Sequence, residues 1–435
     1  MDIDSVNASL HQVHELLRSG GDSTAYTDLL AVLANIIAAA GNPTLRDALV
    51  ASGAIEATLD ALNSGFVPTE EVLHLRVSRG AVLVLRNLIL SARSVDSNSI
   101  LKALQWSLAH ASPETPFFRF SVVSYAELLA NCASRLGSEF KVDAALFSKT
   151  LFGPVTLHLA LSDKSLADPV NVVVGYLAKT DIHANRELLP VVEQLICHEN
   201  FHQWTSYIVE NDTKRRFLEQ AVLAATGRED WDNSQCLTML NWALDILKCA
   251  SPPAIDILNA KVWDTDQLEV LHLVLVRALD ILADLSKFNC AQQFFLEYDV
   301  LDTIIPLFRA VYENTTVKTA KVVSGTQTKE FPVVSSLIVE IVAFTCNSSF
   351  EAQEKIRQLH GLELVLSSCV IDDNNPFLKE RAILCLKFLL EKNKANQQFV
   401  ADLEAKNVAY SSALEAAEYE VDLVEGRVQV KKRQK

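Results

Sequence analysis

The feature that most constrains this fold is a pair of amphipathic helices predicted near the end of the chain, at residues 372–405. We expect Asn375 to cap the first helix and Pro376 to take its first position, where no intrahelical N–H is needed. The apolar positions that follow at helical spacing are Leu378, Ala382, Leu386 and Leu389. We expect Asn393 to end this helix, before a second one that carries Phe399 and Leu403. Such a pair cannot bury its apolar face alone, so it predicts a stack of similar pairs beside it.

Self-similar segments upstream supply that stack. In three of them an apolar helix ends, an Asn- or Ser-rich turn follows, and a second helix restarts at Gln292, Gln353 or Gln397. Gly53 resembles the break between the second and third helices of an armadillo repeat, and Gly361 repeats it. The spacing of roughly 40 residues suits armadillo or HEAT repeats better than tetratricopeptide repeats. We predict an all-α fold, a right-handed armadillo/HEAT-like α-solenoid of about nine divergent repeats.

Two stretches interrupt this pattern. Residues 111–116 include two prolines and should form a loop. Residues 314–330 are polar, β-branched and mildly basic, and we expect them to form a mobile insertion loop within one repeat.

Near the end of the chain the apolar residues no longer recur at helical spacing and instead occupy alternate positions. Apolar residues alternate on either side of residues 425–426, which predicts a short C-terminal β-hairpin. Pairing about that turn places Val421 opposite Val430 and Leu423 opposite Val428. The last residues, 431–435, form a basic tail.

Composition narrows the classes of partner and the compartment. The 435 residues are 49% hydrophobic, with a formal net charge of −15 and a pI near 5.2. This charge argues against nucleic acid or an anionic membrane as a partner and favours basic protein segments.

Eight scattered cysteines without a CxxC pair indicate free thiols in a reducing compartment. We find no signal peptide, and the apolar run at residues 29–41 is too short to span a bilayer, so we expect a cytoplasmic protein.

One motif suggests chemistry. His198, Glu199 and His202 form a literal H-E-x-x-H, the spacing that places two zinc-binding imidazoles and a catalytic glutamate on one helical face. The preceding helix is predicted to end near Cys197, so the motif would lie across a turn, which favours a chance match. Two alternatives to a scaffold stay open: a zinc-dependent hydrolase using these residues, and a copper or zinc handling factor using Cys and His side chains.

The C-terminal stretch resembles the signature of the ataxin-10 homologue domain. The matching positions are Pro376, Arg381, Ala382, Ile383, Leu389, Leu390, Glu391, Asn393, Asn396 and Gln397. The resemblance implies an armadillo-like cytoplasmic scaffold without catalytic residues. Relatives are associated with cytokinesis and cell-cycle signalling, and some fungal members carry the name copper transport protein. The chain has only two methionines and no Met/His cluster, so its residues give that name no support.

The domain organisation and function follow from this resemblance and the repeats. We expect helical repeats over residues 1–330, the ataxin-10 homologue domain over 331–430 and a basic tail over 431–435. The expected function is a non-enzymatic scaffold that binds other proteins and needs no cofactor. A homo-oligomer stays open.

Overall fold

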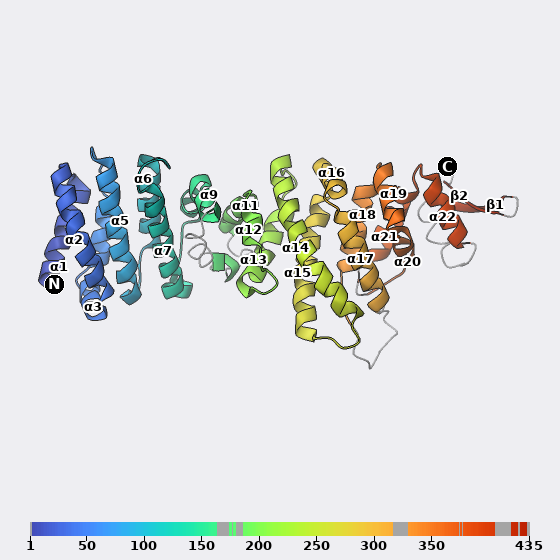
Figure 1. The fold of residues 1–435 in the computed structure, drawn as a ribbon, viewed down its shortest axis with the longest axis horizontal. Coiled ribbons are helices and arrows are strands. Elements are labelled where there is room, and N and C mark those ends of the chain that lie inside the picture. Colours follow the sequence, from blue (N-terminus) through green and yellow to red (C-terminus); the bar gives the residue numbers. More distant parts are fainter. Residues whose placement is uncertain are drawn as a thin grey trace. The chain divides into compact units, whose positions relative to one another are not determined.

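The computed structural model describes residues 2–162, 174–175, 177–179, 186–315, 329–373, 375, 377–404, 419–424 and 427–432. Helices joined by short turns make up most of the described chain, and a two-stranded hairpin follows them (Figure 1). The chain divides into two compact units, Met1–Trp204 and Thr205–Lys435. The prediction of an α-helical fold is confirmed, while the number of repeats stays a prediction.

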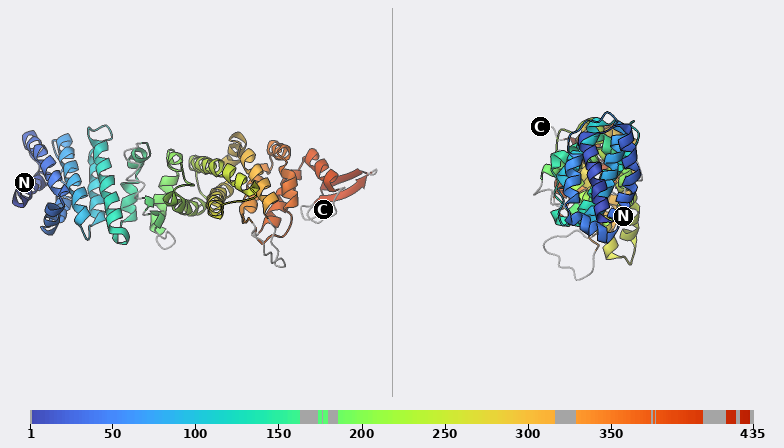
Figure 2. Two further views of the ribbon diagram at one scale, coloured as in Figure 1. Left: turned by 60° about the horizontal axis from the view of Figure 1, so that its bottom comes forward. Right: turned by 90° about the vertical axis from the view of Figure 1, so that its left-hand side faces the viewer.

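Unit 1 is built from short helices and three long ones. Among the described residues its elements are α1 (Ile3–Ser19), α2 (Ser23–Gly41), α3 (Pro43–Ala51), α4 (Ala54–Leu62), α5 (Glu71–Leu88), η1 (Ile89–Ser91), α6 (Ser97–His110), α7 (Phe118–Leu136), η2 (Gly137–Glu139), α8 (Ala144–Lys149), α9 (Pro154–Ser162), η3 (Arg186–Leu188), α11 (Leu189–Ile196) and α12 (Phe201–Trp204). The long helices α2, α5 and α7 lie side by side, as the blue to teal ribbons of Figure 2 show. Residues 111–117 form the loop predicted between α6 and α7.

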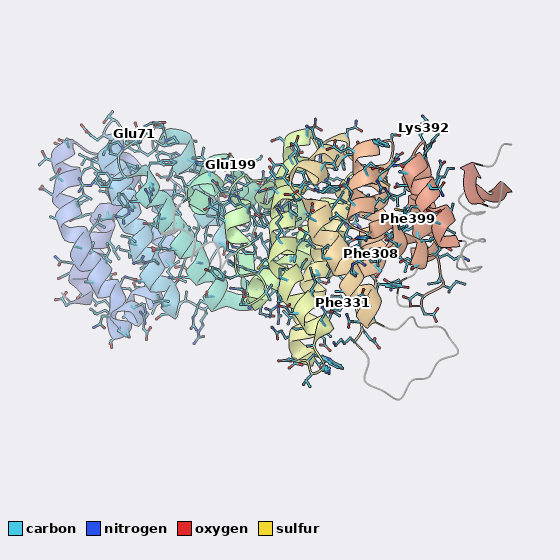
Figure 3. All side chains as sticks on the ribbon, turned by 45° about the vertical axis from the view of Figure 1, so that its right-hand side comes forward. Glu71, Glu199, Phe308, Phe331, Lys392 and Phe399 are labelled. Atoms are coloured by element: carbon cyan, nitrogen blue, oxygen red, sulfur yellow. The ribbon has the colours of Figure 1, made fainter. Side chains whose placement is uncertain are left out.

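Unit 2 repeats this arrangement. Its described elements are α13 (Asp212–Thr226), α14 (Asn233–Asn259), α15 (Thr265–Leu285), α16 (Asn289–Glu297), α17 (Val300–Asn314), α18 (Val334–Cys346), α19 (Phe350–Gln358), α20 (Gly361–Ser367), α21 (Leu378–Leu390), α22 (Lys394–Glu404), β1 (Tyr419–Val424) and β2 (Arg427–Lys432). Helices α13, α15, α18 and α21 form a row in which each helix contacts the next. Phe308 and Phe331 are buried in the core of this unit (Figure 3).

Left-handed residues separate the short helices within a repeat. Gly53, with φ 80°, precedes α4, and Asp299 and His360, with φ 56° and 58°, precede α17 and α20. The sequence analysis assigned the last break to Gly361, but Gly361 is the first residue of α20. A Cβ on Gly361 would lie 2.9 Å from Cδ1 of Ile305, so close packing explains this glycine.

The first helix of the C-terminal pair begins later than predicted. α21 starts at Leu378, and the residue before it, Phe377, has φ 65°. Asn375 therefore does not cap the helix; it is buried, and its Nδ2 donates to Asp372 Oδ2 at 2.6 Å. Pro376 lies outside the described residues. The helix starts later because the left-handed residue Phe377 turns the chain just before it.

The second helix of the pair also differs from the prediction. α21 ends at Leu390, and Asn393 starts α22 instead of ending α21, since its Oδ1 accepts from the N–H of Asn396 at 3.0 Å. Val400 is fully buried on α22, whereas Phe399 is half-buried. The apolar stripe predicted for α21 is confirmed, because its members Leu378, Ala382, Leu386 and Leu389 are buried.

The predicted insertion at residues 314–330 falls mostly on residues 316–328, outside the described part of the chain. Its described ends are in contact with neighbouring helices. Nδ2 of Asn314 donates to Asn259 Oδ1 at 2.8 Å. Nζ of Lys329 donates to the carbonyl oxygen of Ala260 at 2.6 Å and lies 4.8 Å from the ring centroid of Trp263.

The apolar run at residues 29–41, expected to be too short to span a bilayer, is part of the longer helix α2. Its 19 residues are long and apolar enough to cross a membrane by length and composition. In the structure α2 packs between α1 and α5, and Tyr26 on its first turns is buried with its hydroxyl 3.0 Å from Nδ1 of His74. α2 therefore packs one face into unit 1, and 28% of its most apolar 18-residue window is buried.

Strands β1 and β2 form an antiparallel pair. Val421 pairs with Val430 and Leu423 with Val428, which is the register that the alternation of apolar residues predicts. β2 lies against α22, the last helix of unit 2. The hairpin therefore follows directly on the final helix layer.

Candidate protein interaction surface

The H-E-x-x-H motif lies across the turn between α11 and α12. α11 ends at Ile196, so His198 and Glu199 lie in the turn, and His202 is the second residue of the four-residue helix α12. A zinc-protease motif needs both imidazoles on one face of a continuous helix. The two histidines here belong to different local structures.

Local hydrogen bonds fix the histidines of this motif. His198 Nδ1 accepts from the N–H of Asn200 at 3.1 Å, and His202 Nδ1 lies 2.9 Å from the carbonyl oxygen of Glu199. Nδ1 of His158, on α9, lies 3.7 Å from Oε1 of Glu199. Glu199 is labelled in Figure 3. Burial lowers the pKa of His198, and the neighbouring His158 lowers it further. Within the described residues, no group of three or more His, Cys, Asp or Glu side chains is arranged to hold a metal ion.

The cysteines are free, and most are wholly or partly buried. Cys249 is the exposed one of the eight. The sequence spacing suggested no convergence of thiols, yet Cys346 and Cys385 come together between α18 and α21. Burial raises the pKa of Cys385, and its hydrogen bond with Cys346 raises it further. Cys385 therefore packs as a neutral thiol, whereas metal binding requires thiolate.

The polar residues of the C-terminal signature hold helices together. Nδ2 of the buried Asn393 donates to Oε1 of Gln353 at 3.2 Å and to Oε1 of Glu354 at 3.1 Å, and both acceptors lie on α19. Nη1 of Arg381 donates to Ser336 Oγ at 2.7 Å on α18. Of the other members, Ala382, Leu389, Leu390 and Asn396 are buried, and Ile383 and Gln397 are half-buried. These residues have a structural role.

The repeated glutamines also have a structural role, which the sequence analysis missed. Each is the fourth residue of its helix. Nε2 of Gln292 lies 2.9 Å from the carbonyl oxygen of Thr345 in the last turn of α18. Nε2 of Gln353 and of Gln397 each lies 2.8 Å from a carbonyl oxygen in the last turn of α21. The glutamines thus satisfy carbonyl groups that a helix end leaves unpaired.

Unit 2 exposes apolar side chains along its row of long helices. Phe344 on α18 is 40% exposed and Leu384 on α21 is 48% exposed, and Leu273 on α15 is also exposed. Each lies on the helix face opposite the core, one or two turns from a charged residue of the same face. We call this surface of α15, α18 and α21 the unit 2 face. Exposed apolar residues on neighbouring helices are typical of a protein interaction site.

Carboxylates crowd the centre of the unit 2 face. Burial raises the pKa of Asp280, and the neighbouring Asp284 raises it further. Burial also raises the pKa of Glu340, against the effect of Arg381, whose Nη2 lies 2.7 Å from Glu340 Oε2. Lys287 pairs with Asp284, with 3.0 Å between Nζ and Oδ1. Arg277 also lowers the pKa of Asp280 and pairs with Glu219 at 2.8 Å. Four carboxylates thus share three cations, so the face is suited to a further positive charge.

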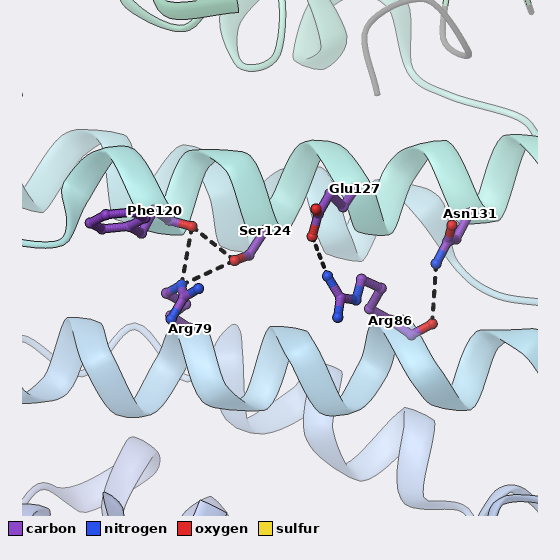
Figure 4. A network of polar contacts seen from close by, with 6 residues as sticks. All are labelled: Arg79, Arg86, Phe120, Ser124, Glu127 and Asn131. Carbon is purple, nitrogen blue, oxygen red and sulfur yellow. Dashed lines mark hydrogen bonds and ion pairs between the residues drawn. The ribbon is translucent and has the colours of Figure 1, made fainter. Parts of the chain in front are cut away.

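Unit 1 has a corresponding face on α5 and α7, which Figure 4 shows from close by. Nε of Arg79 donates to Ser124 Oγ at 3.2 Å, and Arg86 pairs with Glu127. Nδ2 of Asn131 donates to the carbonyl oxygen of Arg86 at 3.3 Å. Polar side chains therefore join the long helices in this unit as they do in unit 2.

Comparison with known proteins places the chain in a family. The model of the spinocerebellar ataxia type 10 protein domain matches residues 334–431. The ataxin-10 homolog of Debaryomyces hansenii is 35% identical over 427 residues, which cover 88% of this chain and 87% of that protein. The chain belongs to the ataxin-10 family.

Other members are similar over less of their length. The ataxin-10 homolog of Candida albicans is 35% identical over 255 residues, 58% of this chain and 54% of that protein. Ataxin-10 of Xenopus tropicalis is 29% identical over 332 residues, 71% of this chain and 61% of that protein. Among solved structures, the crystal structure of Uso1-2 aligns over 99% of this chain and 57% of its own, with 13% identity and a TM-score of 0.34.

The matched ataxin-10 domain starts at the first residue of α18 and reaches β2. It therefore contains the α18 and α21 parts of the unit 2 face. The sequence analysis singled out Arg381 for its family resemblance but missed Phe344, Asp280 and Glu340. Their helical spacing is visible in the sequence, but which helix face stays open to solvent depends on the neighbouring helices.

Proposed function

We propose that this ataxin-10 family member is a non-enzymatic scaffold that binds partner proteins on its rows of long helices. The observation that carries the proposal is the unit 2 face, where exposed apolar side chains flank crowded carboxylates. A partner segment with apolar and basic residues would cover Phe344 and Leu384 and supply the missing positive charge. The net charge of −15 supports the same preference.

The setting of this activity is part of the proposal. The family resemblance supports a cytoplasmic protein with a role in cytokinesis and cell-cycle regulation. The alternatives are a zinc-dependent hydrolase at His198, Glu199 and His202, and a copper or zinc handling factor. Metal analysis of protein purified without added metal separates them from the scaffold, because either alternative requires stoichiometric metal.

The test of the scaffold uses exposed positions, so that folding is preserved. Phe344→Ser with Leu384→Ser should remove the apolar contacts of the unit 2 face and weaken binding of a labelled lysine–leucine peptide at least tenfold, measured by fluorescence anisotropy on the full chain. The control is Val262→Ser with Ile371→Ser, which changes two exposed apolar residues of the same unit outside the row.

Proteins that co-purify with the tagged chain provide the second readout. The same partners should be lost with the Phe344/Leu384 variant and kept with the control variant. If both variants keep every partner and bind the peptide as tightly as the wild type, the unit 2 face is not the binding surface.

A further inference from the structure

Two arginines lie over two exposed phenyl rings on the α5–α7 face of unit 1. Cζ of Arg76 lies 4.8 Å from the ring centroid of Phe117, and Cζ of Arg79 lies 5.7 Å from that of Phe120. Phe117 is 38% exposed and Phe120 is 56% exposed. We call these four residues the arginine–phenylalanine patch. Guanidinium groups held over aromatic rings keep their outer N–H donors directed at solvent, where a planar anion can reach them.

The patch lacks negative charge. Nε of Arg79 donates to the carbonyl oxygen of Phe120 and to Ser124 Oγ, both at 3.2 Å (Figure 4). Within the described chain, neither Arg76 nor Arg79 forms an ion pair with a carboxylate. The Glu127 carboxylate acts on Arg79 electrostatically, but its ion pair is with Arg86. Burial lowers the pKa of Arg79, so its charge is incompletely solvated, and a docked anion would compensate for the lost water.

Other acidic groups near this end of α5 and α7 have local hydrogen-bond partners. Glu114 Oε2 accepts from Ser112 Oγ at 2.8 Å, and Glu71 Oε1 accepts from Thr115 Oγ1 at 3.5 Å. Glu71 is the first residue of α5 and Glu114 lies in the loop before α7, and neither pairs with an arginine of the patch in the described structure. The positive charge of the patch is therefore open to a partner.

The backbone at Phe117 is strained in a way that exposes its ring. Its φ of 70° is in the left-handed region, which disfavours residues with a Cβ. Val333 before α18 and Phe377 before α21 share this conformation, so it is a recurring way of entering a long helix in this chain. At Phe117 it accompanies a ring that is 38% exposed beside Arg76.

We propose that the arginine–phenylalanine patch binds an acidic segment of a partner protein, with its carboxylates on Arg76 and Arg79 and its apolar side chains on Phe117 and Phe120. The inference rests on the proposed scaffold function. It concerns a basic surface of unit 1 and an acidic partner segment, whereas the unit 2 face is acidic and suits a basic segment. A protein segment fits better than nucleic acid, because two arginines neutralise few phosphates and the two exposed rings can cover apolar side chains.

The test measures binding of a labelled glutamate–leucine peptide to the full chain by fluorescence anisotropy. Arg76→Gln with Arg79→Gln should weaken binding at least tenfold. Lys102→Gln with Lys141→Gln removes the same charge from exposed positions elsewhere in unit 1, and it should change binding less than twofold. Because Arg79 is partly buried, Arg76→Gln with Phe120→Ala serves as a second variant at exposed positions only, with the same expected loss.

The outcomes separate this inference from the proposed function. The inference is supported if the patch variants bind the glutamate–leucine peptide more weakly than the wild type. Binding of the lysine–leucine peptide to the unit 2 face tests the proposed function and does not affect this result. The inference is overturned if the wild-type chain does not bind the glutamate–leucine peptide, or if the patch and control variants bind it equally. It is also overturned if a labelled single-stranded oligonucleotide binds the patch more tightly than the peptide.

Discussion

At the scale of single residues, buried polar side chains connect helices that are distant in sequence. Asn393 joins α22 to α19, Arg381 joins α21 to α18, and His74 on α5 meets Tyr26 on α2. Each of these contacts satisfies a polar group that would otherwise be buried without a partner. Substituting one member leaves the other member unpaired, which costs about 1–3 kcal/mol.

His74 gives unit 1 a predictable sensitivity to acid. The side chain is 5% exposed, and burial lowers its pKa from 6.5 to about 4. Above pH 6.5 the histidine is neutral in both folded and unfolded chains, so it has no effect there. Between pH 6.5 and 4 the unfolded chain takes up a proton that the folded chain does not, so stability falls by up to about 3 kcal/mol.

His74→Gln should reduce this loss, because glutamine does not titrate. We expect the midpoint of urea unfolding to depend less on pH between 7 and 4.5 (roughly the window of the shift) in His74→Gln than in the wild type. His110→Gln removes an exposed histidine and should leave the pH dependence nearly unchanged. Equal slopes in the wild type and His74→Gln would show that His74 does not contribute.

At the scale of elements, the hairpin lies against α22, the last helix among the described residues. α22 has no following long helix among the described residues, and Gln397 donates to the end of α21, as Gln353 does from the preceding layer. β2 lies against α22, so the hairpin is placed to cover the outer side of this final layer. A terminal repeat needs such a cover because its outer apolar surface lacks a neighbour.

Removal of residues 419–435 should therefore destabilise unit 2. We expect a decrease of a few degrees in its melting temperature, about 1–3 kcal/mol, and a greater tendency to aggregate. Removal of residues 433–435 alone deletes part of the basic tail and should have no such effect. If the longer truncation melts like the full chain and stays monodisperse by light scattering, the hairpin is not a cap.

At the scale of the whole molecule, most packing contacts are between neighbouring helices. Each long helix contacts the next along its row, and the chain separates into two compact units. When contacts are local in this way, the free energy of unfolding of a helical array is the sum of contributions from each repeat and from each interface between neighbouring repeats. Different parts of the array can therefore unfold separately.

We therefore expect two thermal transitions that core substitutions shift separately. Leu85→Ala in unit 1 and Leu279→Ala in unit 2 each remove a buried side chain and should each cost about 2–5 kcal/mol. Scanning calorimetry should show each change lowering a different transition. A single transition lowered by both changes would show that the units unfold together.

The sequence by itself determined the helical character and the family. Apolar residues at helical spacing are a local property, so the buried stripe of α21 could be read from Leu378 to Leu389. The placement of the H-E-x-x-H motif across a turn followed from the end of the preceding apolar stripe at Ile196. The register of β1 and β2 followed from the alternation of apolar residues about the turn.

Only the tertiary structure decided where the helices begin and which residues face solvent. The start of α21 depends on the left-handed residue Phe377, and the role of Gly361 depends on its contact with Ile305 from another helix. The carboxylates of the unit 2 face, such as Glu340, and the rings over which Arg76 and Arg79 lie come from different helices. Their proximity follows from how neighbouring repeats pack, and helix periodicity within one segment carries no information about that packing.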